Sequence, residues 1–302
     1  MIFPVSAHPD ELPRTWGEFV EREFPEHPRS APTNYRDLLG WPEDEKRELP
    51  RSFDVIGDIV LVRMPASLVP RQEEVGTALL RFVPGARLVG SDHGVRGPER
   101  RRVVERIAGT GGWRTRHREN GVDLEVDVER AYFSPRLALE HARVAEEVVA
   151  GDRVYDLCCG VGPFSVTIAR QGRAGTVTAV DANPDAIALL RATLSRYPLA
   201  GRVRALEARL EEFLPSAEPV ERVVLNLPRE GIKYLPSVAR TVAPGGRLYY
   251  YEVGPRSELE GRGVALVNVL APEGTFSAVA HRSVHPYSPD ADLAVFVLER
   301  SG

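Results

Sequence analysis

The stretch DLCCGVGPFS, residues 156–165, decides the fold class of this chain. It begins inside an apolar run, RVYDLCC, with the composition of a β-strand, and it leads into a segment with helical character, GVGPFSVTIARQG. Gly160 permits a tight turn, and Gly162 lets a ligand approach the backbone closely. The helix that follows offers free backbone N–H groups in its first turn. A strand, a Gly-x-Gly turn and a helix N-terminus in this order indicate a site for a nucleotide-type cofactor.

The acidic residues around this turn favour one cofactor. Asp181 ends the next predicted strand, TVTAVDA, where a carboxylate can hold ribose hydroxyls. A dinucleotide site would have a third glycine three residues after Gly162, but this chain has Ser165 there. An acid at the end of the first strand, here Asp156, is typical of enzymes that bind S-adenosylmethionine (SAM), where it positions the amino acid part of the cofactor. We therefore expect SAM. The alternative is a glycine-rich turn in an unrelated α/β domain.

The pattern along the chain predicts an α/β protein with three parts. Residues 1–50 are rich in Pro, Glu and Arg, with short helical pieces, and residues 51–130 have the pattern of a small α+β domain. Within residues 131–302, strands alternate with helices, which predicts a parallel, doubly wound sheet that ends in an antiparallel pair. Residues 53–65 have the pattern of one strand with a central glycine, and residues 134–151 that of a helix stopped by Gly151.

Composition excludes several classes of protein. No apolar run is long enough to span a membrane, and the N-terminus lacks the pattern of a signal peptide. Cys158 and Cys159 are adjacent, too close for an ordinary disulfide, and no other cysteine exists. We therefore expect a cytoplasmic protein without a disulfide framework, in which both thiols fill space beside the turn. His117 and His141 stand apart from carboxylate or thiol partners at ligand spacing, so no metal is expected.

Positive charge is concentrated in one segment of a chain whose net charge is −4. Residues 96–118 contain eight arginines and two glutamates. Such a segment can form an anion-binding face, or it can be an ordinary solvated surface. The charge pattern alone leaves both interpretations open.

A third motif follows the strand RVVLNLP. Asn226, Leu227 and Pro228 form the Asn-x-Pro pattern that lines the pocket of SAM enzymes acting on nitrogen. There the Asn oxygen and a nearby carbonyl accept hydrogen bonds from the substrate. The alternative is a turn at the end of a strand, because Asn and Pro are common turn residues.

Together these motifs carry a family resemblance. The segments HRENG (117–121), YFSPRLALE (132–140), DLCCGVGPFS, VDANPDAIALL (180–190) and NLP resemble the archaeal and eukaryotic tRNA (guanine-37-N1) methyltransferases and their relatives in wybutosine synthesis. The resemblance covers about residues 50–302 and implies a Rossmann-like class I methyltransferase fold preceded by a small α+β domain. It also implies SAM as the cofactor and tRNA as the partner. FSPR, GVGPFS and NLP are more similar to the methyltransferase branch than to the branch that transfers a 3-amino-3-carboxypropyl group.

The resemblance implies a role for individual residues. Glu140 would act as general base on guanine N1, Arg100 would stabilise the charge that develops on O6, and Asn226 would orient the base. Arg101 or Arg102 could replace Arg100 in that role. Arg136 would bind the cofactor carboxylate, facing the same way as Glu140 one helical turn on. The alternative for Arg136 and Glu140 is an exposed ion pair on a helix.

The cofactor site that the motifs and the resemblance imply includes a strand-end glutamate. The family usually has an aspartate near position 208 that holds the adenine amino group, and Glu207 or a backbone group would replace it here. The expected set is Phe133, Arg136, Asp156, Cys158, Gly160, Gly162, Asp181, Ala182, Glu207, Asn226 and Pro228.

Two other functions are compatible with the sequence. A pI of about 6.0 and a short N-terminal segment also suit methylation of a small molecule, or transfer or cyclisation of the aminocarboxypropyl group with release of methylthioadenosine. Tyr249, Tyr250 and Tyr251 could line such a pocket, although core packing explains alternate members of that strand. The remaining possibility is an RNA-binding scaffold that no longer catalyses.

Overall fold

A seven-stranded sheet is the centre of the larger domain. The computed structural model describes residues 32–97, 101–199 and 201–302. The strand order is β12-β13-β11-β10-β7-β8-β9. Strands β9, β8, β7, β10 and β11 run parallel, whereas β13 is antiparallel to both β11 and β12. The predicted doubly wound sheet and its final antiparallel pair are confirmed. The strands are β7 (Arg153–Leu157), β8 (Thr176–Asp181), β9 (Val203–Glu207), β10 (Val220–Leu225), β11 (Val242–Pro255), β12 (Phe276–Pro286) and β13 (Ala291–Arg300).

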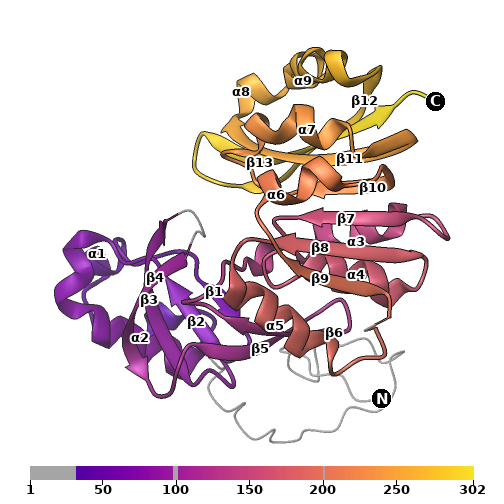
Figure 1. Cartoon of the computed structure of the whole chain (residues 1–302). Coiled ribbons are helices and arrows are strands. Elements are labelled where there is room, and N and C mark those ends of the chain that lie inside the picture. Colours follow the sequence, from indigo (N-terminus) through magenta and orange to yellow (C-terminus); the bar gives the residue numbers. More distant parts are fainter. Residues whose placement is uncertain (1–31, 98–100, 200) are drawn as a thin grey trace, which may run out of the picture.

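Helices cover both faces of this sheet; Figure 1 shows its strands one below another, overlapped by these helices. One face packs against α3 (Ala138–Glu147), α4 (Pro163–Gln171) and α5 (Pro184–Leu194). The other packs against α6 (Leu210–Phe213), α7 (Leu235–Ala239), α8 (Arg256–Leu259) and α9 (Arg262–Leu270). Tyr249 and Tyr251 belong to the first core and Tyr250 to the second, as strand alternation requires. All three are at most 1% exposed, so core packing accounts for all of them.

A smaller sheet forms the N-terminal domain. Its order is β1-β2-β3-β4, and it packs against α2 (Gln72–Phe82), with α1 (Glu43–Lys46) nearby. The core of this domain includes Tyr35, Leu39, Trp41 and Leu49. Side chains of the segment that the sequence analysis set apart as residues 1–50 thus contribute to this core, and the boundary at residue 50 stays a prediction. The strands are β1 (Asp54–Ile56), β2 (Ile59–Val62), β3 (Leu88–Arg96) and β4 (Arg101–Gly109).

The single strand expected over residues 53–65 is a hairpin of β1 and β2. Gly57 turns the chain with a φ of 58°, and an added Cβ there would lie 2.2 Å from the Thr115 Oγ1 atom. The prediction was wrong because an apolar run with a central glycine fits either one bulged strand or two short strands.

A second hairpin joins the two domains. It consists of β5 (Arg114–Glu119) and β6 (Val122–Asp127), and it lies between β1 and α5 (Figure 1). The inward residues Val122, Leu124 and Val126 belong to the core of the larger domain. Ile56, Ile59 and Leu88 of the smaller sheet belong to the same core, so the hairpin packs against both domains, and the boundary at residue 130 stays a prediction.

Helix α3 ends earlier than predicted. Its last residue is Glu147, and Val148 is already extended, with φ −73° and ψ 127°. Val148 is buried in the core, and Gly151 lies in the turn beyond it, with a φ of 88°. Burial of Val148 in an extended conformation therefore ends the helix before the glycine. Within the described residues, none of the helices combines the length and the apolar character that a membrane crossing requires.

Candidate active site

Four of the predicted acidic and amide residues lie along one edge of the large sheet. Parallel strands place their carboxyl ends at the same edge, and ligands of α/β folds bind there. Asp156 lies near the end of β7, Asp181 ends β8 opposite Glu207 of β9, and Asn226 follows Leu225 of β10. Leu225 is in register with Leu157 of β7, so these chain ends are level with one another.

Asp156 is a buried carboxylate with one oxygen available. The backbone N–H of Ser165 (3.1 Å) and its hydroxyl (2.6 Å) both donate to Oδ2. Oδ1 has no hydrogen-bond partner among the described residues. Burial raises the pKa of this carboxyl to about 6. A buried acceptor without a partner is costly unless a ligand satisfies it, and the ammonium group of SAM is a donor that fits.

The turn after β7 brings the backbone close to the same edge. Gly162 begins α4 with a φ of 78°, and an added Cβ would lie 2.5 Å from Cδ1 of Leu190. Cys158 also has a positive φ, 61°, which is uncommon for a residue with a side chain. Burial raises the pKa of the Cys158 and Cys159 thiols, so both stay protonated. This favours the expected space-filling role over nucleophilic catalysis.

Asp181, at the end of β8, is hydrogen-bonded to the turn that follows β7. Its Oδ2 accepts from the Gly160 N–H (2.7 Å), and its Oδ1 accepts from the Asn183 N–H (2.8 Å). A carboxylate at the end of this strand is also a suitable acceptor for ribose hydroxyls. Ala182 and Glu207 are both exposed at this end of the sheet, where an adenosine group would reach them.

Asn183 is a residue that the sequence analysis did not single out. It is buried and caps α5 by accepting from the Asp185 N–H at 3.0 Å. Its side-chain amide donates to the Arg130 carbonyl at 2.8 Å. An Asn directly before Pro184 is a helix-start pattern, so this signal was present in the sequence.

Glu140 lies buried on α3, 3% exposed. Its Oε1 accepts from the Tyr251 hydroxyl (2.8 Å) and from Nη2 of Arg282 (2.7 Å), and its Oε2 accepts from Nε of Arg282 (3.2 Å). Tyr251 directly follows Tyr250, which is in register with Leu225, the residue before Asn226. Glu140 and Asn226 are therefore level with each other at the carboxyl edge.

Backbone hydrogen bonds fix the position of the NLP motif, residues 226–228. The Gly231 N–H donates to the Leu227 carbonyl (2.7 Å), and the Val253 N–H donates to the Pro228 carbonyl (3.2 Å). Asn226 is half-buried, and none of the hydrogen bonds just described uses its side chain.

Arg136 does not share a direction with Glu140. Arg136 lies in a 3-10 turn, Pro135–Leu137, and its Nε donates to Oδ1 of Asp54 at 2.8 Å. Its side chain is 46% exposed, whereas Glu140 is buried. The expected common face was wrong because the chain changes from 3-10 to α geometry between the two residues, so four residues no longer make one α-helical turn.

The three arginines considered for the contact with guanine O6 lie in different surroundings. Arg100 lies outside the described residues. Arg101 is half-exposed and pairs with Asp185 at 3.2 Å. Arg102 is buried and donates to Asp92 (2.5 Å) and to the carbonyl of Phe133 (3.0 Å). Arg102 therefore joins β4 of the small domain to the FSPR segment.

Comparisons with known proteins agree with this arrangement. A profile of the TRM5/TYW2 methyltransferase domain matches residues 115–277, and one of the TYW2 N-terminal domain matches residues 35–112. The chain belongs to the TRM5/TYW2 methyltransferase family. It is a SAM-dependent transferase with the class I methyltransferase fold. The junction of the two matched regions falls between β4 and β5.

Individual relatives cover most of the chain. The tRNA (guanine(37)-N(1))-methyltransferase Trm5b of Pyrococcus abyssi is 33% identical over 272 residues, which are 87% of this chain and 78% of the relative. Its crystal structure superposes with a TM-score of 0.82, covering 94% of this chain and 84% of that one, at 30% identity. A complex of aTrm5 with tRNALeu gives a TM-score of 0.80 at 26% identity, covering 93% and 84%. TYW2 of P. horikoshii, at 21% identity, shares the fold, with a TM-score of 0.73 over 88% of this chain and 97% of that one.

This TRM5/TYW2 family member also contains a buried acid–histidine group that the sequence analysis missed. Oε1 of Glu119 lies 2.7 Å from Nδ1 of His141, and its Oε2 lies 3.9 Å from Nε2 of His117. The expectation that both histidines lack a carboxylate partner was therefore wrong. Glu119 and His117 are close in sequence, but only the fold brings His141 to them. In the described part of the chain, no group of three or more His, Cys, Asp or Glu residues is arranged to hold a metal ion.

Proposed function

We propose that this family member transfers the methyl group of SAM to N1 of guanine 37 in tRNA. The observation that supports this most directly is the edge shared by Asp156, with its available Oδ1, and by the pair Glu140 and Asn226. One end of the sheet thus offers an acceptor for the cofactor and polar groups for a nitrogen substrate. The relatives named as tRNA (guanine(37)-N(1))-methyltransferases support the choice of substrate.

The cofactor would be held by residues of β7, β8 and the turn between β7 and α4. Asp156 would accept from the ammonium group, Asp181 would accept from ribose hydroxyls, and Gly160 and Gly162 would allow close approach of the backbone. When bound, SAM supplies an electrophilic methyl group together with its leaving group. Arg136 remains the candidate for the cofactor carboxylate, and it would exchange its contact with Asp54 for that role.

The substrate would be oriented by Asn226 and deprotonated by Glu140. The side-chain oxygen of Asn226 would accept from a guanine N–H, and the carboxylate of Glu140 would take the proton from N1. A cation near O6 would stabilise the charge that develops there, and Arg100 remains the prediction for that role. Removing water and holding these groups in place would supply most of the remaining acceleration.

Transfer of the aminocarboxypropyl group is the second candidate function. The observation that favours it is the match of residues 35–112 to the TYW2 N-terminal domain. In that reaction the substrate would attack the γ-carbon of the cofactor, and methylthioadenosine would leave. The two functions therefore release different sulfur-containing products, S-adenosylhomocysteine and methylthioadenosine, which differ in mass.

Mass spectrometry of the products separates these functions. Purified protein is incubated with SAM and an unmodified tRNA that carries G37, with a G37→A tRNA and a reaction without RNA as controls. S-adenosylhomocysteine and 1-methylguanosine, formed only with G37, are the expected result. Methylthioadenosine would favour the second candidate, and turnover without RNA would indicate a small-molecule substrate. Absence of SAM binding in calorimetry would overturn both and favour a scaffold. A cytoplasmic location stays a prediction.

A further inference from the structure

A buried acid–histidine pair lies beside the proposed cofactor site, and the proposed reaction does not use it. Oε1 of Glu119 lies 2.7 Å from Nδ1 of His141, and the two residues are 6% and 1% exposed. A buried ion pair is weak evidence of stability, because the cost of removing two charges from water offsets much of their attraction. The pair therefore calls for a further explanation.

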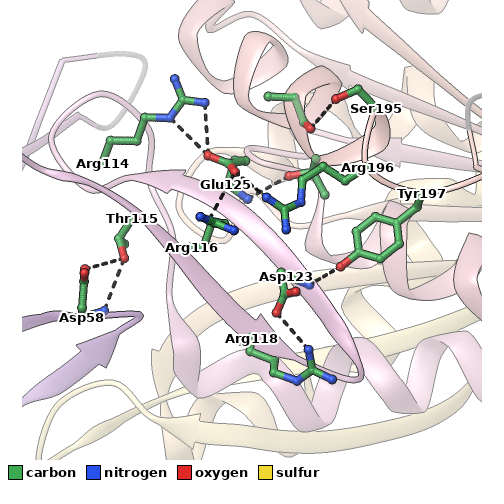
Figure 2. Close-up of polar contacts among 12 residues, drawn as sticks. Asp58, Arg114, Thr115, Arg116, Arg118, Asp123, Glu125, Ser195, Arg196 and Tyr197 are labelled. Carbon is green, nitrogen blue, oxygen red and sulfur yellow. Dashed lines mark hydrogen bonds and ion pairs between the residues drawn. The ribbon is translucent and has the colours of Figure 1, made fainter. Parts of the chain in front are cut away.

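The hairpin that carries Glu119 is anchored on two sides. The hydroxyl of Thr115 on β5 donates to Oδ1 of Asp58 beside the β1–β2 turn, at 2.7 Å (Figure 2). The Tyr197 hydroxyl, beyond the end of α5, accepts from the Asp123 N–H of β6 at 2.7 Å, as Figure 2 also shows. These contacts fix the hairpin between the smaller domain and the segment after α5, so the position of Glu119 is fixed as well.

Two histidines lie beside Glu119, and their surroundings differ. Nδ1 of His117 accepts from the Gly57 N–H (3.2 Å), so the proton of this ring is on Nε2, which lies 3.9 Å from Oε2 of Glu119. Burial lowers the pKa of His117, which keeps this ring neutral near pH 7. His141 is therefore the histidine that can bring a positive charge to the pair, and an adjacent carboxylate stabilises an imidazolium.

His141 lies against the start of α4, where Asp156 is bound. Its ring meets the ring of Phe164 edge-on, with the centroids 4.5 Å apart. The next residue, Ser165, donates to Oδ2 of Asp156 from its N–H and from its hydroxyl. Neither Nε2 of His141 nor Oδ1 of Asp156 has a hydrogen-bond partner among the described residues. The two groups are thus neighbours in one core, where charges act over several ångströms because little water screens them.

The charge of His141 acts on Asp156. Burial raises the pKa of Asp156 to about 6, whereas the hydrogen bonds from Ser165 and the charge of His141 act in the opposite direction. Asp181, at the end of β8, is itself an acid and raises this pKa further. The imidazolium of His141 therefore favours the ionised form of Asp156.

Other ionisable groups near Asp156 and His141 do not supply this positive charge. Burial raises the pKa of the Cys158 and Cys159 thiols, so both stay protonated and neutral. Arg282 reaches α3 from β12, but its guanidinium is hydrogen-bonded to Glu140 at 2.7 and 3.2 Å.

We propose that Glu119 and His141 are positioning residues of the cofactor site, in which Glu119 orients an imidazolium that favours the carboxylate form of Asp156 for binding the ammonium group of SAM. The proposal rests on the cofactor role of Asp156 in the proposed function. An ionised carboxylate binds an ammonium group much more strongly than a neutral carboxyl does. Because His141 acts without a hydrogen bond to Asp156, Oδ1 stays available for the cofactor.

The pH dependence of SAM affinity tests the proposal. Calorimetry of the whole chain gives the dissociation constant from pH 5.5 to 7.5 for the wild type and for the double variant Glu119→Gln/His141→Gln. This variant removes both charges and keeps hydrogen-bonding groups of similar size. In the wild type, affinity should fall as the pH drops through about 6, where Asp156 takes up a proton.

In the double variant, Asp156 should titrate about one pH unit higher, because a favourable charge has been removed. SAM should then bind about eightfold more weakly than to the wild type at pH 5.5, but less than about twofold more weakly at pH 7.5. A merely structural defect would weaken binding by the same factor at every pH, and that result would overturn the proposal.

Two further variants complete the experiment. His141→Gln alone removes the imidazolium and leaves the Glu119 carboxylate, so its curve should shift in the same direction. His281→Gln is the matched control, because His281 is an exposed histidine on β12 that stacks on Phe296, and its curve should coincide with that of the wild type.

Unshifted curves in both His141 variants would overturn the proposal. If the wild-type affinity still depends on pH in that case, the cofactor role of Asp156 stands. A wild-type affinity that is constant from pH 5.5 to 7.5 would overturn that role and the proposal together. Formation of 1-methylguanosine by the wild type would support the proposed function in either case.

Discussion

Arg282 on the edge strand β12 donates two hydrogen bonds, of 2.7 and 3.2 Å, to Glu140 on α3, which is 142 residues earlier in the chain. The carboxylate is almost completely buried, and the guanidinium is 21% exposed. A buried carboxylate stays ionised only when a partner compensates its charge. Arg282 is therefore a positioning residue whose two hydrogen bonds fix the direction of the Glu140 carboxylate.

Arg282→Gln should shift the pH dependence of methyl transfer. Without the cation, the ionised form of the buried carboxylate is disfavoured, so the acidic limb of the rate profile should move to higher pH. The measurement is the single-turnover rate across pH 5.5–9. Arg153→Gln is a matched control, because Arg153 makes a bidentate pair with Glu221 (2.9 and 3.1 Å) at the amino end of the sheet. If the pH–rate profile of Arg282→Gln were the same as that of the control Arg153→Gln, the role of Arg282 would be contradicted.

Glu140→Gln should slow methyl transfer by about 10²- to 10⁴-fold, the usual contribution of a general base. Gln keeps the size of the side chain and an acceptor for Tyr251 but takes no proton from N1. SAM affinity should not change, because Asp156 and Asp181 are intact. The single-turnover rate tests the loss of activity, and a calorimetric titration with SAM tests the unchanged affinity. A rate within threefold of the wild type would remove Glu140 from the chemistry.

Asp156→Asn should stabilise the protein without SAM and abolish SAM binding. The pKa of this carboxyl is about 6 in the folded protein and 3.8 as the ordinary value. Between these values the folded state binds more protons than the unfolded state, so stability falls as pH rises. At pH 7.5 the buried charge costs on the order of 3 kcal/mol.

The test for Asp156 is the melting temperature at two pH values. Asp156→Asn should melt higher than the wild type at pH 7.5, and the difference should shrink below pH 4. Asp152→Asn is the control, because Asp152 pairs with Arg222 at 3.2 Å and accepts from the Val149 N–H. It should melt lower. If Asp156→Asn melts no higher at pH 7.5 and still binds SAM, the buried oxygen does not serve the cofactor.

Replacing one member of the Glu119–His141 pair should lower the free energy of unfolding more than replacing both. Both side chains are buried, at 6% and 1% exposure. His141→Leu leaves buried Glu119 with only the more distant His117, at 3.9 Å, and should cost about 3 to 5 kcal/mol, whereas the double variant with Glu119→Leu should cost less. Chemical denaturation of the single and double variants measures the coupling between the two positions. Additive losses would show that the pair is not an energetic unit.

The sequence by itself determined the sheet class and the cofactor turn. Strand–helix alternation predicts parallel pairing, and the carboxyl ends of parallel strands meet at one edge. Asp156, Gly162 and Asp181 could be placed there because each is tied to the end of a strand or the start of a helix. These features depend on local periodicity and local backbone conformation, which neighbouring residues set.

Only the tertiary structure decided which side chains meet across the chain. The strand order β12-β13-β11 brings Arg282 and Tyr251 to Glu140, and no local pattern encodes that order. Arg136, which was expected to face the same way as Glu140, is exposed and donates to Asp54 on the distant strand β1, whereas Glu140 is buried. The pairing of β5 with β6 sets Asp127, Glu125 and Asp123 opposite the three arginines Arg114, Arg116 and Arg118. Long-range pairing follows from burial of the whole core, whereas a sequence pattern reports only which residues are to be buried.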